Sequence, residues 1–401
     1  MPEAAEGGWC NECNQPSRYH LHTWFEELTD YFLPKLPRKF ISRRLEAFVE
    51  RAFVAFLTAV GIARWKSDFT VADIQQRSFF FIEEGKRRGM TFEALTGPWG
   101  ITCHFRAWYK GKTFYFDGLP GAQWLNGPRA AAMDDKKSSK QMLREGGFPV
   151  AKSRPFWFFQ KYAAARYGAQ LGFPLVVKPR SGSVARHVTT DIADEAGLRT
   201  AIRKALQYGP AFVVEQYLKG ASVHRGTVVD FERVAVAKQI PANVTGDGAH
   251  TIQELIGIKN ANPRRGSPRE RQFTLYKLVL NDAARRRLGE QGYDPASVPP
   301  KSRKVFLQRD PFLRWGGDVE EMTPHVHPDN IKLYKDIAYF FGVRLVGIDI
   351  LFEDAARSWR QQRCAVLELN SSPCIELHHA PFAGKPQNVA SWVADIVEKY
   401  Y

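Results

Sequence analysis

Three side chains near the end of the chain form the strongest candidate for chemistry. Asp349 lies in an apolar run, residues 346–351, that predicts a strand, and Glu368 and Asn370 lie in a second such run, residues 364–370. Positions i and i+2 of a strand face the same side, so Glu368 and Asn370 share a face. Acidic groups on apolar strands are costly unless they are paired, hydrogen-bonded or bound to a metal. Two carboxylates and an amide oxygen are suited to bind a Mg²⁺ ion that bridges nucleotide phosphates. The alternative to metal binding is that these residues lie on a strand face that is exposed to solvent.

Basic side chains upstream complement these acids. Lys178 ends a predicted strand and precedes a Gly/Ser loop that contains Ser181 and Gly182. A lysine in this place can neutralise phosphate charge, and the amides of such a loop can cradle phosphates. The Walker A pattern is absent, which excludes a P-loop fold. A second lysine, Lys140, lies on a predicted helix. The residues that close the next predicted strand suit a hinge under an adenine, and they are Glu215, Gln216, Tyr217 and Leu218.

Regular elements must hold these residues in place. From residue 135 onward, predicted strands and helices alternate, which indicates an α/β or α+β fold. The predicted strands are apolar and β-branched, at residues 175–178, 211–215, 226–230, 346–351 and 364–370. Upstream, apolar spacing predicts helices within residues 20–60 and 74–89, and residues 101–117 read as a hairpin. A Gly/Pro-rich passage then ends a region of unknown role, residues 1–132, so residues 133–401 are expected to form the second domain.

Length and composition limit the class of protein. The 401 residues suit two or three domains of a globular protein. Five cysteines do not make a disulfide framework and favour a reducing, cytoplasmic location. The N-terminus lacks the pattern of a signal peptide, and the longest apolar stretch, residues 52–63, is too short to span a membrane. We therefore expect no membrane partner.

The net charge of +15 suggests an anionic partner. It is uneven, because residues 259–314 hold 14 basic and 5 acidic side chains, a net charge of +9. One interpretation is a solvated helical face. A nucleic-acid surface would add aromatic or glycine-rich runs among the basic residues, and these are sparse, so no nucleic acid is expected. We favour the interpretation that this positive charge attracts nucleotide phosphates and an acidic acyl donor or peptide.

Taken together, these motifs resemble the ATP-grasp superfamily, and within it the ligase module of cyanophycin synthetase and the glutathione-synthetase half of bifunctional glutamate–cysteine ligase/glutathione synthetase. The resemblance covers about residues 135–401 and implies an α+β fold of two lobes gripping ATP. Many ordered matches carry it: residues 135–150, 172–179, 213–218, 246–256, 262–266, 297–300, 346–349, 367–373 and 378–386.

The resemblance implies an enzyme, an ATP- and Mg²⁺- (or Mn²⁺-) dependent carboxylate–amine ligase. ATP would phosphorylate a carboxylate, and an amine would displace phosphate to form an amide. By position, Lys140 and Lys178 would hold phosphates, residues 215–218 the adenine and ribose, and Asp349, Glu368 and Asn370 the metals. Lys238 and Arg309 match basic positions that face the phosphates or the acyl group. Substrate contacts are expected from Arg225, Asn243, Arg314, Ser372, Glu376 and His378.

The sequence departs from the family pattern on the substrate side and in the glycine-rich loop. Two loop glycines are replaced by Ala185 and His187, so any left-handed backbone there would cost energy. Small polar groups after Arg309 are replaced by Phe312, Arg314 and Trp315. A family arginine is replaced by Glu376, which suits an amine-bearing acceptor or reflects surface drift. An extra residue before Arg225 makes its transfer uncertain. We thus expect a substrate that differs from that of the family, a small molecule or peptide of acidic character.

Other classes of function stay open from the sequence. A kinase on the same fold would release a stable phosphorylated product without an amine. A catalytically weakened nucleotide-binding protein would explain the lost loop glycines, although the retained lysines and metal ligands oppose it. The Mur-ligase-like domain of cyanophycin synthetase does not follow residue 401, so no second ATP-dependent step is expected from this chain. Homo-oligomers are common in this group, but no interface is legible.

Cysteine and histidine residues give weaker signals. Cys10, Cys13, His20 and His22 have zinc-like types, but the second pair is too close for common finger spacing, and a mobile terminus is the alternative. Cys103 and His104 lie in the predicted hairpin, where a ligand role is not favoured. Cys374 follows the metal-bearing strand, and we interpret it as lining a pocket because no basic partner is implied.

Overall fold

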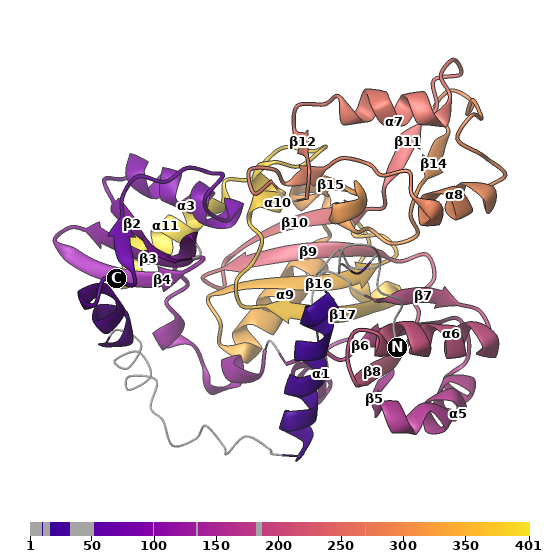
Figure 1. Ribbon diagram of the computed structural model, residues 1–401, viewed down its shortest axis with the longest axis horizontal. Coiled ribbons are helices and arrows are strands. Elements are labelled where there is room, and N and C mark those ends of the chain that lie inside the picture. Colours follow the sequence, from indigo (N-terminus) through magenta and orange to yellow (C-terminus); the bar gives the residue numbers. More distant parts are fainter. Residues whose placement is uncertain are drawn as a thin grey trace. The chain divides into compact units, whose positions relative to one another are not determined.

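The computed structural model describes residue 10 and residues 17–32, 52–98, 100–133, 135–181, 187–268 and 270–401 (Figure 1). The chain forms two compact units. The first comprises Met1–Phe40, Asp135–Ala221 and Arg363–Leu367, and the second comprises Ile41–Asp134, Ser222–Gln362 and Glu368–Tyr401. The expected boundary at 132/133 lies beside one change of unit, whereas the region upstream of it mostly shares a unit with the C-terminal half.

The first unit is built on an antiparallel sheet of strand order β5-β8-β6-β7. Its strands are β5 (Ser153–Trp157), β6 (Leu175–Pro179), β7 (Thr189–Ile192) and β8 (Ala211–Gln216). Its helices are α1 (Ser17–Phe32), α4 (Lys136–Glu145), α5 (Lys161–Leu171) and α6 (Glu195–Leu206). Apolar residues of β5, β6 and β8 pack against α5 and α6, with Phe156, Leu175 and Phe212 almost fully buried. This core fixes the direction in which the polar residues of β6 and β8 point.

The second unit contains a five-stranded sheet of order β15-β10-β9-β16-β17. The strands are β9 (Ser222–Val229), β10 (Arg233–Ile240), β15 (Asp318–Glu321), β16 (Leu345–Phe352) and β17 (Cys364–Asn370), and the first four residues of β17 are counted with the first unit. The antiparallel register sets Arg225 of β9 directly opposite Asp349 of β16. On the other face, α9 (Pro328–Phe341) places the Tyr334 ring under Gly226, where a Cβ atom would lie 2.3 Å from the ring. A larger residue at position 226 would therefore displace the helix.

A second sheet of order β1-β2-β3-β4 belongs to the same unit. Its strands are β1 (Arg64–Lys66), β2 (Thr91–Gly97), β3 (Gly100–Tyr109) and β4 (Lys112–Asp117), and α3 (Gln76–Arg87) and α11 (Val389–Tyr400) accompany it. The predicted hairpin and the predicted helix at 74–89 are confirmed as β3–β4 and α3. Phe81, Phe92, Val229, Leu345 and Val393 share one core, so the N-terminal region and the C-terminal helix are packed together.

The basic segment at 259–314 folds into short elements of the second unit. They are the end of α7 (Ile252–Asn260), α8 (Asp282–Gly289), β12 (Arg265–Gly266) paired with β13 (Leu275–Tyr276), and the 3-10 turn at Leu313–Trp315. A further strand of the segment, β14 (Lys304–Phe306), pairs with the preceding strand β11 (Asn243–Thr245). A short helix, α10 (Glu376–His379), follows β17. The helix expected within residues 20–60 is α1 and a helix at 52–59, and residues 33–51 lie outside the described part.

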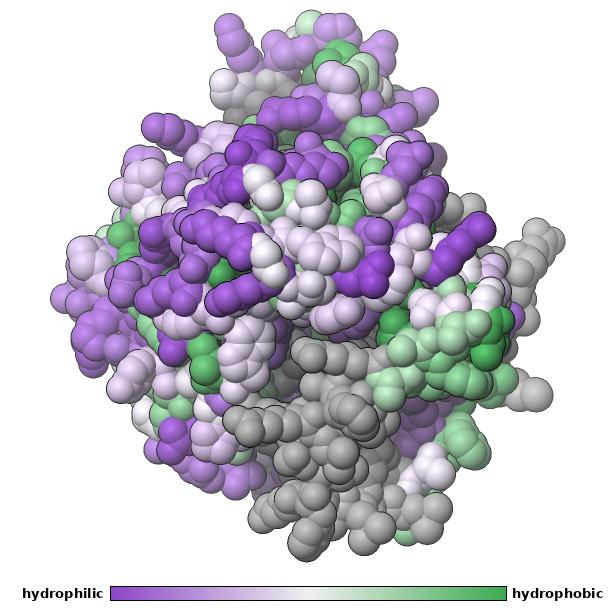
Figure 2. All heavy atoms as spheres, turned by 90° about the vertical axis from the view of Figure 1, so that its left-hand side faces the viewer, coloured by the Kyte–Doolittle hydropathy of each residue, from purple (hydrophilic) through white to green (hydrophobic). Residues whose placement is uncertain are grey.

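The described surface is mostly polar on the face seen in Figure 2. Within the described ranges, no helix is both long and apolar enough to cross a bilayer.

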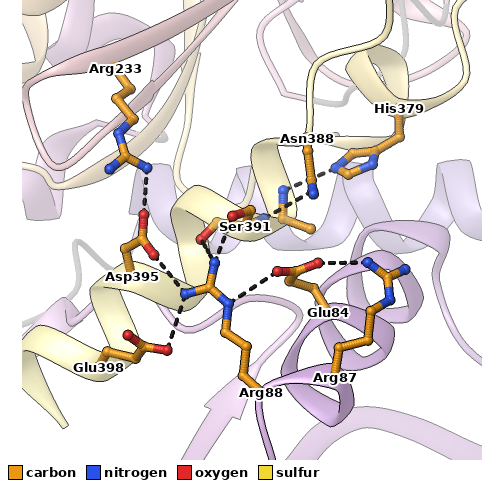
Figure 3. A network of polar contacts seen from close by, with 10 residues as sticks. Glu84, Arg87, Arg88, Arg233, His379, Asn388, Ser391, Asp395 and Glu398 are labelled. Carbon is orange, nitrogen blue, oxygen red and sulfur yellow. Dashed lines mark hydrogen bonds and ion pairs between the residues drawn. The ribbon is translucent and has the colours of Figure 1, made fainter.

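A polar network anchored on Arg88 joins α3 to α11 (Figure 3). The Arg88 guanidinium bonds Glu84 at 3.0 Å, Asp395 at 2.6 Å, Glu398 at 3.1 Å and the Ser391 hydroxyl at 2.6 Å. The Arg88 side chain is 21% exposed and that of Glu84 11%, whereas those of Asp395 and Glu398 are 40% and 38% exposed. Charge-assisted bonds of this kind are the stronger class of hydrogen bond.

Arg88→Ala is therefore expected to lower the free energy of unfolding by about 2–3 kcal/mol, because several partly buried acceptors lose one shared donor. Urea denaturation at neutral pH measures the effect. The matched control is Arg87→Ala, since Arg87 pairs with the same Glu84 but is 69% exposed, and it should change little. Equal effects of the two substitutions would contradict this role for Arg88.

Candidate active site

In the first unit, two lysines converge on one buried glutamate. Lys140 of α4 contacts the Glu215 carboxylate through Nζ, and Lys178 of β6 lies 3.0 Å from the same oxygen, Oε2. Lys140 and Glu215 are 6% and 2% exposed. Two cations thus share one anion in a region with little water. Sequence reasoning named all three residues but did not expect Glu215 to be the counterion of both lysines.

Burial and pairing shift the acid–base properties of this triad in definite directions. Burial lowers the pKa of Lys140 to about 8, with Lys178 adding to the decrease and Glu215 opposing it. For Glu215, burial favours the neutral form, but the two ammonium groups outweigh it and hold the pKa at about 2. The carboxylate is therefore ionised at neutral pH, and the triad carries a net positive charge that suits phosphate oxygens.

Two backbone amides of the segment after Glu215 already have hydrogen-bond partners. The Gln216 amide donates to the Lys152 carbonyl at 2.9 Å, and the Tyr217 amide donates to the Pro174 carbonyl at 3.2 Å. Leu218 is 7% exposed. An adenine would thus use other groups of this segment than those two amides.

The loop that follows Lys178 is described only in part. Ser181 lies at its start, and Gly182 lies outside the described residues. The carboxyl group of Glu27 on α1 lies beside Ser181, and burial raises its pKa. The sequence contained no signal for this approach of α1 to the loop.

In the second unit, the predicted metal ligands meet on one face of the five-stranded sheet. Arg225 holds both oxygens of Asp349, with its Nη2 atom 2.5 Å from Oδ2, and the same Nη2 lies 3.9 Å from Glu368 Oε1. The Asn370 amide nitrogen lies 3.5 Å from that Glu368 oxygen. From the sequence, Arg225 is expected to contact the substrate, and in the structure its guanidinium lies against the two acids.

This donor set fits a divalent cation of the hard class. Burial, reinforced by the nearby Glu368 charge, raises the pKa of Asp349 despite Arg225. Two carboxylates that repel each other within one site are what a divalent cation would stabilise. Asp349, Glu368 and Asn370 would hold the ion, which would supply charge neutralisation for phosphate oxygens.

A third group of polar residues lies after β17. Arg77 of α3 donates to the Ser372 carbonyl and lies 3.1 Å from its hydroxyl. Glu376 has a buried oxygen, Oε2, with no hydrogen-bond partner among the described residues. Burial raises the pKa of Glu376 although the Arg77 charge opposes it. Burial also raises the pKa of the Cys374 thiol to about 11, so it is protonated at neutral pH, which supports its reading as a lining residue rather than a nucleophile.

Arg77 is the functional candidate that sequence reasoning missed. It lies on a helix 295 residues upstream of its partner Ser372, and no motif marks it.

Other predicted residues lie elsewhere in the second unit. The register pairs Lys238 with His224, so the Lys238 side chain emerges on the face opposite to that of Arg225 and Asp349. Arg309 forms an ion pair with Glu290 at 2.8 Å and is 41% exposed. Arg314 lies in the 3-10 turn at Leu313–Trp315. None of these three is placed by a described contact beside the metal ligands.

Asn243 and His378 are built into the interior. The Asn243 amide donates to Asp318 at 2.9 Å, and Asp318 also binds Lys259 at 2.7 Å and Arg265. Two cations of the basic segment are therefore neutralised internally. His378 is fully buried between Thr227 and Glu321, at 2.9 and 2.7 Å. Its position stabilises the sheet and exposes no atom to a ligand.

The antiparallel sheets and their helices agree with the predicted α+β ATP-grasp fold, and this prediction of the fold is confirmed. Cyanophycin synthetase of Synechocystis sp. is 34% identical over 265 residues, which are 66% of this chain and 30% of that protein. The glutathione biosynthesis bifunctional protein of Mannheimia succiniciproducens is 31% identical over 267 residues, 64% of this chain and 34% of that protein. No family model matches the sequence.

A solved structure supports the same fold. The bifunctional glutathione synthetase from Pasteurella multocida aligns with a TM-score of 0.62 and 24% identity, over 89% of this chain and 46% of that one. The chain thus spans about a third of the length of the curated relatives named above. Similarity of this extent establishes the fold, and the activity has to be inferred from the residues.

Proposed function

We propose that the protein is an ATP-dependent carboxylate–amine ligase that uses Mg²⁺ or Mn²⁺. One observation carries the proposal: Asp349, Glu368 and Asn370 gather on one sheet face around Arg225. Sequence similarity to the cyanophycin synthetases extends over 265 residues. Hard oxygen ligands on a nucleotide-binding fold are typical of phosphoryl transfer.

The lysine pair would serve the nucleotide. Lys140 and Lys178 share a single counterion, Glu215. When ATP binds, its phosphates would neutralise the positive charge of the lysine pair that Glu215 does not balance. A preformed cationic site of this kind stabilises phosphate charge without reorganising at the moment of reaction.

The reaction would proceed in two steps. A substrate carboxylate oxygen attacks the γ-phosphorus of ATP, the bond to the β-phosphate oxygen breaks, and an acylphosphate and ADP form. A neutral amine then attacks the acyl carbon, phosphate leaves, and the amine loses a proton to give the amide. The protein's part is to position the reactants and neutralise charge.

Residues after β17 would select the amine. Glu376 carries a buried carboxylate oxygen without a described partner, which suits an ammonium or amine group. The acyl donor would be an amino acid or acidic peptide, since the net charge of +15 favours anions.

Phosphate release tests the proposal. Purified protein is incubated with ATP, Mg²⁺ and pooled amino acids or short acidic peptides. Phosphate release that requires an amine and an amide product found by mass spectrometry would support the ligase. A stable phosphorylated product formed without any amine would support a kinase instead. Nucleotide binding without turnover under all conditions would favour a nucleotide-binding protein with weakened catalysis. Ala185 and His187, which stand in place of two loop glycines of the resembled pattern, motivate this alternative.

A further inference from the structure

A cysteine and two histidines from distant parts of the first unit meet in one place. Cys10 precedes α1, His20 lies on α1, and His187 lies just before β7. One ligand atom from each lies within 4.8 Å of the other two. His20 and His187 are 6% and 2% exposed, so the two histidine rings are screened from solvent, and Cys10 is half-buried.

Hydrogen bonding fixes the tautomer of His187. Its Nδ1 atom lies 3.0 Å from the Lys204 carbonyl oxygen, which can only accept a hydrogen bond, so Nδ1 carries the proton. In the neutral ring, the lone pair is then on Nε2, and this atom lies 3.4 Å from Cys10 Sγ. Histidines that bind metals commonly donate their other ring N–H to a backbone carbonyl in this way.

The backbone of His187 also indicates a positioned side chain. It has φ of +53°, in the left-handed region that glycine favours, and the resembled loop pattern has glycine at this position. A non-glycine residue persists there when its surroundings hold it in place. The contacts of both ring nitrogens and the edge-on packing of the His20 ring, 5.0 Å from the His187 ring, provide that support.

We propose that Cys10, His20 and His187 bind a zinc ion. One thiolate and two imidazoles are ligands of the type zinc prefers, and the Cys10–His187 separation of 3.4 Å is close to the edge of a tetrahedral site, about 3.5 Å for Zn–S and Zn–N bonds of roughly 2.3 and 2.05 Å. Binding releases the Cys10 thiol proton, and a water molecule or a further ligand completes the fourth position. The ion would tie α1 to the residue that follows the glycine-loop region.

This set differs from the one expected from spacing alone. His22 is exposed and pairs with Glu26 at 3.4 Å, so it lies outside the cluster. Cys13 lies outside the described residues. The ring of Tyr208 packs against both His20 and His187. Aromatic packing around a thiol–imidazole hydrogen bond is the alternative explanation of the cluster, and it predicts no retained metal.

Metal content and cobalt spectroscopy of the full chain test the proposal. Protein stripped with a chelator, reloaded with Zn²⁺ and dialysed should retain one zinc per chain. Co²⁺ in its place should show the charge-transfer band of a thiolate ligand and the visible bands of a tetrahedral ion. His187→Gly should weaken zinc binding 10-fold or more, and it should fold because glycine accepts this backbone. Cys10→Ser should abolish the charge-transfer band.

Three variants distinguish loss of a ligand from loss of structure. His22→Ala on the same helix and Cys103→Ser on the exposed hairpin should retain zinc at the wild-type level. His20→Cys should also retain zinc, because it substitutes one good ligand for another, and should intensify the thiolate band of the cobalt form. The proposal is overturned if wild type retains no zinc, if its cobalt form lacks a thiolate band, or if His187→Gly binds zinc as tightly as wild type.

Discussion

Glu368→Gln should reduce amine-dependent phosphate release by about 10²- to 10³-fold, the size of effect seen when one preorganised electrostatic contact to a reacting group is removed. Glu368 is the more exposed acid of the set, with its side chain 31% exposed and its Oε1 atom 3.9 Å from Arg225 Nη2. The isosteric amide keeps the shape of the side chain but removes the negative charge that a divalent ion needs. Initial rates over a range of Mg²⁺ concentrations measure the effect, and the apparent affinity for Mg²⁺ should fall together with the rate.

A matched control separates ligand loss from damage to the sheet. Glu320 of β15 belongs to the same sheet but pairs in register with Lys238, on the face opposite to Arg225. Glu320→Gln should leave both the rate and the Mg²⁺ dependence within about 2-fold of wild type. If Glu368→Gln turned over as fast as wild type at every Mg²⁺ concentration, the metal assignment would be wrong.

Glu215→Gln should lower the free energy of unfolding by about 3–5 kcal/mol, the cost of breaking a buried ion pair by removing one partner. Lys140 would then be a buried ammonium group without its counterion, and it is only 6% exposed. Adding Lys140→Met to Glu215→Gln should recover part of the loss, because the uncompensated charge is removed. Urea denaturation of the single and double variants measures both effects.

The pH dependence gives an independent check on Glu215. Its pKa is about 2 in the folded protein against an ordinary value of 4.5. A depressed carboxyl pKa stabilises the folded state above the unfolded pKa, and this contribution disappears as the pH falls from about 4.5 toward 2. The stability difference between wild type and Glu215→Gln should therefore shrink as the pH falls through this range. Glu195→Gln, which breaks an exposed pair with Arg199, should cost little at any pH. A Glu215→Gln effect as small as that of Glu195→Gln would refute the buried triad.

The residues proposed for the nucleotide and metal sites could be identified from the sequence because local order marks them. Lys178 ends an apolar strand before a Gly/Ser loop, and Glu368 and Asn370 alternate with buried residues of β17. Strand periodicity and the ordered matches to the resembled pattern identified them without any contact information. In the folded protein, the lysines lie in the first unit and the oxygen donors lie in the second.

The placement of Lys238, Arg309 and His378 shows the limit of such reasoning. A basic residue in a strand can face either side of a sheet. Only the pairing register shows that Lys238 lies on the face of the sheet that Arg225 and Asp349 do not share. His378 looked like a substrate contact but lies fully buried between two strands. These roles stay predictions, and variants at Lys238 and Arg309 are the direct tests.

The sequence by itself determined the strands and the types of residue available for phosphate and metal binding, because these follow from periodicity and from local motifs, and the resemblance of its ordered motifs to a known family implied the ATP-grasp fold. The tertiary structure decided which charges neutralise one another. Glu215 as the counterion of two lysines, Arg225 between Asp349 and Glu368, and Lys259 with Arg265 on Asp318 all join residues far apart in the chain. The tertiary structure also shows that His187, and not His22, joins Cys10 and His20 in the cysteine–histidine cluster. Such pairings depend on long-range packing and strand register, which no local pattern encodes.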